Sequence, residues 1–498
     1  MGITGISSQT SATVQSLVDL RSQLDDLQRQ LVTGQKSDTY AGLGLGRGLT
    51  VSLRNQLSAL SSFDDSIANI NVRLGLGQTA LGGIASAADS VKQSALTSPF
   101  ALGASGQTGD QRTAAGQLDQ ILALLNTQSG DTYLFGGTAT DRPAVESTDH
   151  VLNGNGTQVG LKTVIAERNQ ADGVGALGRL SIPVPAALST VTSVSEDLAG
   201  SVFGMKLAGV ASTLTGATVA GPAGAPPLIS VDFGTNTLNA GESATFSFTL
   251  PDGSSQNVTL TATTAAPPGP NQFTIGVDAH TTAVNMQAAL TSAVTKVAAT
   301  SLSAASTVAA GNDFFGGPPP MRVSGLPATA TALVAGTATN TVTWYTGDNG
   351  AGPARNTATA RVDVSLTVSY GMRANEEALR QAVQSIAIFA AQSYSPADPN
   401  GAAAYAGLTE RVAAGLHGSP GQQKITDIEA DLTAAQTTVF SAKDRHAQGI
   451  KTLTDLLQSI ENVPQEQVGA QILALQTSLQ ASLQTTAMLA KISLVNYL

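Results

Sequence analysis

Apolar residues recur at intervals of three and four along both ends of the chain, a spacing that predicts long amphipathic helices. Near the N-terminus the stripe consists of Leu17, Leu20, Leu24, Leu27 and Leu31. Near the C-terminus the apolar positions are Ile472, Leu475, Leu479, Leu483, Leu494 and Tyr497. We place Leu475, Leu479 and Leu483 on one stripe, at i, i+4 and i+8. Gly34 and Pro464 are expected to end these outer helices, because glycine favours helix termini and proline interrupts helices.

Further helices are predicted inside these two. One apolar seam begins at Leu53 and continues to Val91, and another helix is expected over 111–125. Asn375 is expected to cap a helix, and Ser419 with Pro420 to open a very long one. The glycines at 42, 44, 46 and 48 predict a flexible joint. They follow a helix rather than a strand and match neither nucleotide-binding pattern, so a phosphate loop is disfavoured.

The middle of the chain has a different pattern. From Asp131 to Tyr370 it is rich in Thr, Val, Gly and Pro, and several runs alternate with a period of two. One run, 246–250, is followed by the turn 251–253 and by a second run, 258–260. The run 362–370 is expected to be one strand. A helix is expected over 281–297, so that 223–325 would form a small α+β module.

The expected fold is mainly α with a β-rich insertion. Both termini would form a long antiparallel helical rod, and the β-rich outer domain would contain the small α+β module. Five segments follow from this interpretation. They are 1–50 (terminal helix and joint, paired with 464–498), 51–145 (first half of the rod), 146–370 (variable β-rich region, with the module at 223–325), 371–463 (second half of the rod) and 464–498 (C-terminal helix).

The outermost helices carry more apolar surface than two helices can cover. A helix that cannot bury its apolar face is only marginally stable in water, so these segments are expected to need further copies of the chain. A coiled-coil scaffold would show the same pattern. The expected assembly interface consists of Leu17, Leu20, Leu24, Leu27, Leu31, Ile472, Leu475, Leu479, Leu483, Leu494 and Tyr497.

Composition narrows the possible partners. Charged residues make up 12% of the chain, the formal net charge is −10, and no run of Lys and Arg indicates binding to nucleic acid or an anionic membrane. No cysteine is present, which excludes disulfides, zinc–thiolate sites and cysteine nucleophiles. The first residues do not resemble a Sec signal peptide, and no apolar run is long enough for membrane insertion.

No catalytic constellation emerges from the sequence. The four histidines, at 150, 280, 417 and 446, share no helical face and no metal-ligand spacing. Neighbouring carboxylates such as Asp25 and Asp26 point about 100° apart on a helix, so they form no catalytic pair. No nucleophile elbow is found, and Trp344 and Tyr345 are expected in a core. We therefore expect no enzyme, no catalytic residue, no cofactor and no metal.

Four stretches point to a family. They are LVTGQKSDTYAGLG (Leu31–Gly44), DTYLFGGTATDRP (Asp131–Pro143), SYGMRANEEALRQAV (Ser369–Val383) and LQTSLQASLQTTAMLAKISLVNYL (Leu475–Leu498). Together they resemble the conserved ends of the bacterial flagellin family. The tail is similar to that of hook–filament junction proteins, which tend to end in Leu-Leu-Asn-Tyr and an apolar residue, whereas filament flagellins more often end in Leu-Leu-Arg. Ser37-Asp38-Thr39 departs from the Asp-Asp pair of many members.

The resemblance implies a structural subunit of the flagellum that joins hook to filament. It implies export through the flagellar apparatus without a cleaved Sec signal and an extracellular location. The implied partners are other copies of the chain, a neighbouring hook-associated protein, flagellin and the export apparatus, with an export chaperone as a further candidate. A filament flagellin is the alternative within the family, and a secreted adhesin or sheath protein is the alternative outside it.

Overall fold

The computed structural model describes residues 3–97, 99–235 and 237–495. The chain divides into two compact units. Unit 1 is formed by Met1–Asn71, Ala360–Val368 and Thr437–Leu498, and unit 2 by Val72–Thr359 and Ser369–Gln436. Helices α2 (Arg47–Thr97) and α10 (Ile425–Glu461) each continue from one unit into the other. The two units therefore cut across the five segments expected from the sequence.

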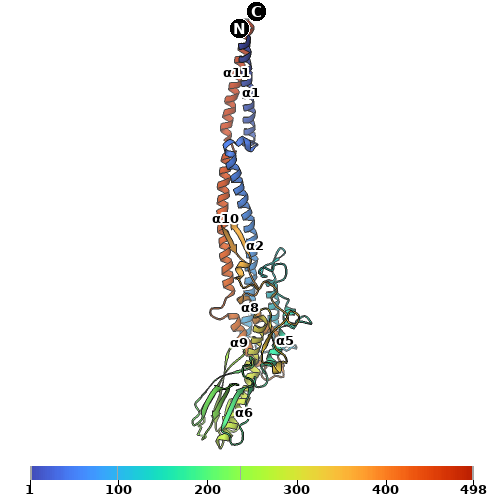
Figure 1. Ribbon diagram of the computed structural model, residues 1–498, viewed down its shortest axis with the longest axis vertical. Helices are drawn as coiled ribbons and strands as arrows, with labels where there is room; N and C mark the ends of the chain where they lie inside the picture. The colour runs from blue at the N-terminus through green and yellow to red at the C-terminus, as the bar shows by residue number, and fades with distance from the viewer. Residues whose placement is uncertain (1–2, 98, 236, 496–498) are drawn as a thin grey trace. The chain divides into compact units, whose positions relative to one another are not determined.

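In unit 1 the outer helices α1 (Ile3–Thr33) and α11 (Gln465–Val495) lie side by side (Figure 1). α1 ends as predicted at Gly34, which adopts a φ of 72° that suits glycine. α10 and α11 are separated at Pro464, also as predicted. Between α1 and α2 a short 3-10 helix, η1 (Tyr40–Gly46), contains Gly44 in a non-helical conformation. The glycine-rich segment is thus a joint between helices.

A two-stranded sheet in the same unit differs from the expectation. β13 (Thr359–Asp363) and β14 (Leu366–Ser369) pair with one another, so 362–370 is not one strand. The Asp363 carboxylate accepts the backbone amide of Val364, which supports a turn between the two strands. Val362 and Val368 are both buried. Val364, which the period-two pattern places on the same face, is 67% exposed, because the chain turns between the two strands.

The helices of unit 2 are α3 (Gly109–Leu125), α4 (Thr148–Asn153), α5 (Leu161–Ala171), α6 (Ala279–Val297), α7 (Ser303–Phe315), α8 (Glu377–Ala391) and α9 (Gly401–His417). α8 packs against α3, α7 and α9. It is buried around nearly its whole circumference, with Leu379, Val383, Ile386 and Phe389 fully enclosed. α3 begins with a capping box between Thr108 and Gln111. α8 therefore lies in the core of unit 2, where polar side chains such as Gln384 are buried together with its apolar ones.

Two predicted helix starts in unit 2 are wrong. Asn375 does not cap α8, because its side-chain amide donates to the Asn349 oxygen at 2.7 Å and Glu376 occupies the cap position. α10 begins at Ile425 rather than after Ser419 and Pro420, since the Ser419 amide donates to the Gln422 side chain in a turn. In both places a longer-range or turn hydrogen bond replaces the local cap.

The β strands gather mainly in one module of unit 2. Its strands are β3 (Leu180–Ser181), β4 (Val191–Glu196), β5 (Lys206–Ser212), β6 (Thr218–Ala223), β7 (Leu228–Asp232), β8 (Ser243–Thr249), β9 (Ser255–Thr263) and β10 (Gln272–Thr274). They form the sheets β3-β4-β7-β6 and β10-β9-β8-β5. α6 packs on both sheets (Figure 1) and shares a core with Phe246, Phe248 and Leu260. The two runs expected on either side of the turn 251–253 are β8 and β9, and the structure pairs them in antiparallel register.

This module is larger than the expected segment 223–325. β7 pairs with β4 and β6, and β8 pairs with β5, so strands that precede residue 223 belong to it. The remaining short strands are β1 (Gln128–Ser129), β2 (Thr132–Tyr133), β11 (Met321–Val323) and β12 (Leu333–Ala335). The fold is therefore a mixture of long helices and several small sheets.

Candidate assembly surface

The joint of unit 1 brings the end of α1 to the start of α11. The backbone amide of Lys36 donates to the Glu461 carbonyl at 2.7 Å, and the Val463 amide donates to the Gly34 carbonyl at 3.0 Å. The Lys36 ammonium donates to the Ser459 carbonyl at 3.2 Å. Because the two helices start and end at this bridge and pack together, they run in opposite directions.

A salt bridge closes the same joint from the side of α2. The Arg54 guanidinium donates to both carboxylate oxygens of Glu461, with its shortest contact at 2.9 Å. It also lies 5.7 Å from the Tyr40 ring centre. The hydrogen bonds to Glu461, followed by its charge, raise the pKa of Arg54. Since Arg54 is half exposed, this pair positions the joint more than it stabilises the fold.

Between α1 and α11 the contact is a narrow apolar seam. On α1 it contains Leu17, Leu20, Leu24 and Leu27, which are only half-buried. On α11 it contains the buried Val468 and Ile472, and then Leu475, Leu479, Ser482 and Thr486, which are half-buried. Contacts that alternate between three and four residues are typical of coiled-coil packing. The seam becomes polar toward the far end of the described part of α11.

Leu483 does not lie on this seam, contrary to the predicted stripe. It is 50% exposed, while Ser482 occupies the position facing α1. The reason is geometric: a stripe at i, i+4 and i+8 drifts around the helix, whereas a seam between two helices alternates steps of four and three. Leu31 is 38% exposed at the end of α1. Leu494 lies in α11, but its side chain and all of Tyr497 are outside the described residues.

A second set of apolar side chains faces away from the seam, and Leu483 is the one member of it that the sequence analysis placed in the expected interface. On α1 the set is Val14, Val18 and Val32, and on α11 it is Leu473, Leu483 and Met488. Val18 is 56% exposed and Leu473 is 66% exposed. We call these six residues the outer apolar set. The i, i+4 spacing of Val14 and Val18 was the available signal, but the leucine seam dominated the pattern.

Few charges accompany the outer apolar set on α11. No charged residue occurs from Gln467 to Ala490, and the exposed positions there are mostly Gln, Ser, Thr and Ala. α1 carries more charge: Arg29 pairs with Asp26 and Asp38 at 3.2 and 2.8 Å. An uncharged surface loses little solvation when it is buried, which favours packing against another protein surface.

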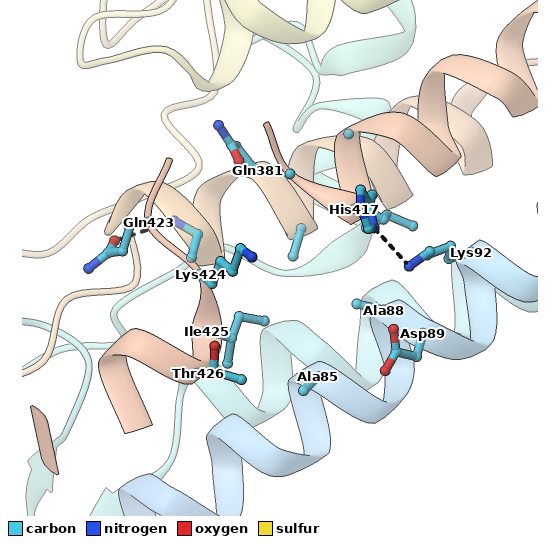
Figure 2. A pocket seen from close by; sticks show the side chains of 15 residues that line it. Ala85, Ala88, Asp89, Lys92, Gln381, His417, Gln423, Lys424, Ile425 and Thr426 are labelled. Atoms are coloured by element: carbon cyan, nitrogen blue, oxygen red, sulfur yellow. Dashed lines mark hydrogen bonds between the residues drawn. The ribbon is translucent and has the colours of Figure 1, made fainter. Parts of the chain in front are cut away.

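Unit 2 contains a cavity of about 240 Å³ (Figure 2). Side chains of α2, α8 and α9 and of the start of α10 line it. Lys92 and His417 point toward each other, and the Lys92 ammonium donates to His417 Nδ1 at 3.5 Å. Asp89 and Lys424 lie nearby. Its lining holds no serine or cysteine, and Asp89 and His417 are its two side chains of the kinds that bind metals.

Neither a metal site nor a membrane-spanning helix is found within the part of the chain that the structure covers. Among residues 3–97, 99–235 and 237–495, no three His, Asp or Glu side chains converge as a metal site would require. Trp344 and Tyr345 are buried in a core, as predicted: the Trp344 ring packs edge-to-face against Phe315, and the Tyr345 ring packs beside Trp344. Of the helices described, none is both long and apolar enough to cross a membrane.

No protein-family model matches the sequence, and no curated protein is significantly similar to it.

Proposed function

We propose that this chain is a structural subunit of the bacterial flagellum, flagellin-like, that joins hook to filament by assembling with other copies of itself. Its partners would be a neighbouring hook-associated protein, flagellin and the export apparatus, with or without an export chaperone. It would be extracellular and not an enzyme. Within the assembly both termini would form a long antiparallel rod, and the β-rich region would face outward.

The observation that carries the proposal is the outer apolar set on α1 and α11. Two helices of this length bury one seam and leave Val14, Val18 and Leu473 in water. Burying a valine or leucine side chain fully is worth roughly 1.5–3 kcal/mol. Isolated helix pairs gain little from intrinsic propensity alone, so a partner surface supplies the missing stabilisation. Because both ends of the sequence resemble the flagellin family, that partner surface would belong to another copy of the chain or to a neighbouring flagellar subunit.

The experiment compares Leu473→Asp with Gln480→Asp on the exposed side of α11. Both variants add one charge at an exposed position, but only the first removes an apolar contact. We expect Leu473→Asp to weaken self-association of the purified chain at least tenfold, since about 1.4 kcal/mol corresponds to tenfold. Gln480→Asp should change it less, because it adds a charge on the same side of α11, two helical turns away, without removing an apolar side chain. Sedimentation of both proteins at several concentrations measures the difference.

Leu479→Asp is a less specific test of self-association. Leu479 faces α1 within the same chain, so its replacement would also disrupt the packing of α11 against α1. Equal self-association of the Leu473 and Gln480 variants would contradict the proposed interface.

Labelled antibody on intact flagella tests where the protein is located: a single band between hook and filament supports the junction subunit. Labelling along the whole filament would instead indicate a filament flagellin.

A further inference from the structure

A buried histidine in unit 1 has no part in the proposed assembly. His446 lies on α10, and its side chain is only 3% exposed. Histidine is the side chain whose ordinary titration falls between about pH 5 and 8. A buried imidazole at a contact between elements can therefore make that contact depend on pH.

The ring of His446 lies between two carboxylates that come from different elements. Its Nδ1 is 3.1 Å from Oδ1 of Asp64 on α2. Its Nε2 is 3.8 Å from Oδ2 of Asp363, the last residue of β13. Nε2 is buried and makes no hydrogen bond to another described group. The Phe63 ring packs beside it, with the ring centres 5.9 Å apart.

The charged groups around the ring come from all three elements. α2 supplies Asp64, and the β13–β14 hairpin supplies Asp363 and Arg361, whose guanidinium lies 6.0 Å from the Phe63 ring centre. α10 supplies Arg445, 3.3 Å from Asp363. The Val364 amide above all, with smaller help from Arg445 and His446, lowers the pKa of Asp363. Asp363 is therefore a carboxylate throughout the histidine range.

The two protonation states of the ring fit this site differently. An imidazolium has two N–H groups and can direct one toward each carboxylate. A neutral ring that keeps its proton on Nδ1 for Asp64 turns the lone pair of Nε2 toward the carboxylate of Asp363. A buried acceptor that faces an anion loses its solvation and gains no partner.

We propose that His446 is a proton-dependent clamp that holds the β13–β14 hairpin on α2 and α10. The clamp is closed when the ring is protonated and directs one N–H group toward each of the two carboxylates. It loosens when the ring loses its proton, because Nε2 then presents a lone pair to the carboxylate of Asp363. The contacts of His446 with Asp64 and Asp363 lie within one chain, so the clamp does not depend on assembly.

The test is amide hydrogen exchange of the full-length chain at low concentration, from about pH 5 to pH 8. Rates are corrected for the intrinsic pH dependence of exchange and compared with those of the buried helix α8. We expect the protection of 359–369 to fall about tenfold across this range, while α8 changes little. Constant corrected protection of the hairpin would overturn the clamp.

Two variants distinguish the effect of His446 on hairpin protection from the effects of other titrating groups. His446→Gln keeps a polar side chain but cannot be protonated, so the pH dependence of hairpin protection should vanish. His417→Gln, in unit 2, should leave that dependence as in the wild type. If His446→Gln does not fold, the wild-type ring is followed by NMR: hairpin amides that titrate together with the His446 ring support the clamp. Hairpin amides that do not follow the ring, or an unaltered pH dependence in a folded His446→Gln, refute it.

Discussion

Arg411 on α9 donates a hydrogen bond from Nε to Oδ2 of Asp252 at 2.7 Å, in the turn between β8 and β9. Its NH2 group donates to the Ser254 hydroxyl at 3.0 Å. Both members of the ion pair are largely buried. The β module is therefore tied to the helical core of unit 2 by a charged contact, in addition to its connecting segments.

Replacing Asp252 by Ala should lower the free energy of unfolding by about 3–5 kcal/mol, because it leaves the Arg411 charge buried without its partner. Chemical denaturation followed by circular dichroism measures the change. Asp65→Ala provides the control, since Asp65 is an exposed aspartate on α2 and such surface changes usually stay within about 0.5 kcal/mol. A similar small effect of both substitutions would show that the Arg411 contact contributes little.

The limits of the β module decide whether it can be removed. Deleting 223–325 would strand β4 and β5, whose partners are β7 and β8, and would expose Val194 and Leu207 from the core. We expect that deletion to give insoluble protein. Replacing 180–297 by a Gly/Ser linker keeps α7, which packs on α5, α8 and α9, and should leave a soluble remainder. Solubility and thermal unfolding compare the two deletions, and a soluble first deletion with an insoluble second would show that our boundaries are wrong.

Gly34 and Gly48 offer a matched test of the joint. Both have open space where a Cβ would be added, but Gly34 has a φ of 72° and Gly48 lies inside α2. A left-handed residue other than glycine costs roughly 1–2 kcal/mol, so Gly34→Ala should destabilise unit 1 by that amount. Gly48→Ala should stabilise it by about 0.4–1 kcal/mol. Denaturation midpoints measure both, and a loss of stability in Gly48→Ala would contradict this reading.

Glu242 closes a loop of the β module with four hydrogen bonds. It accepts from the Thr215 hydroxyl and the Asn239 side-chain amide, and from both backbone amides, and these bonds lower its pKa to about 2 from 4.5. Because the pKa of Glu242 is lowered in the folded chain, the ionised carboxylate contributes fully to folding stability above the pKa that it has in the unfolded chain. This contribution is lost as the pH falls through about 2. NMR titration of the side-chain carboxyl carbon should therefore show a midpoint well below that of an ordinary glutamate. In Thr215→Val the midpoint should move upward, and an unchanged midpoint would show that the hydroxyl does not hold the charge.

The sequence by itself determined the features that depend on neighbouring residues. The spacing of the leucines predicted helices at both ends of the chain, and Gly34 and Pro464 predicted where these helices end. The alternation before and after the turn 251–253 predicted the strands β8 and β9. These signals are local because helix periodicity, helix termination and tight turns are set within a few residues.

Only the tertiary structure decided which faces meet and which partners distant residues find. Ser482, rather than Leu483, faces α1, because the register of two paired helices overrides the apolarity of a single position. Asn375 bonds Asn349 instead of capping α8. His446 meets the carboxylate of Asp64, 382 positions away, which no local pattern announces. Contacts between segments so far apart depend on how all the elements pack, and the spacing of residues along one segment carries no information about them.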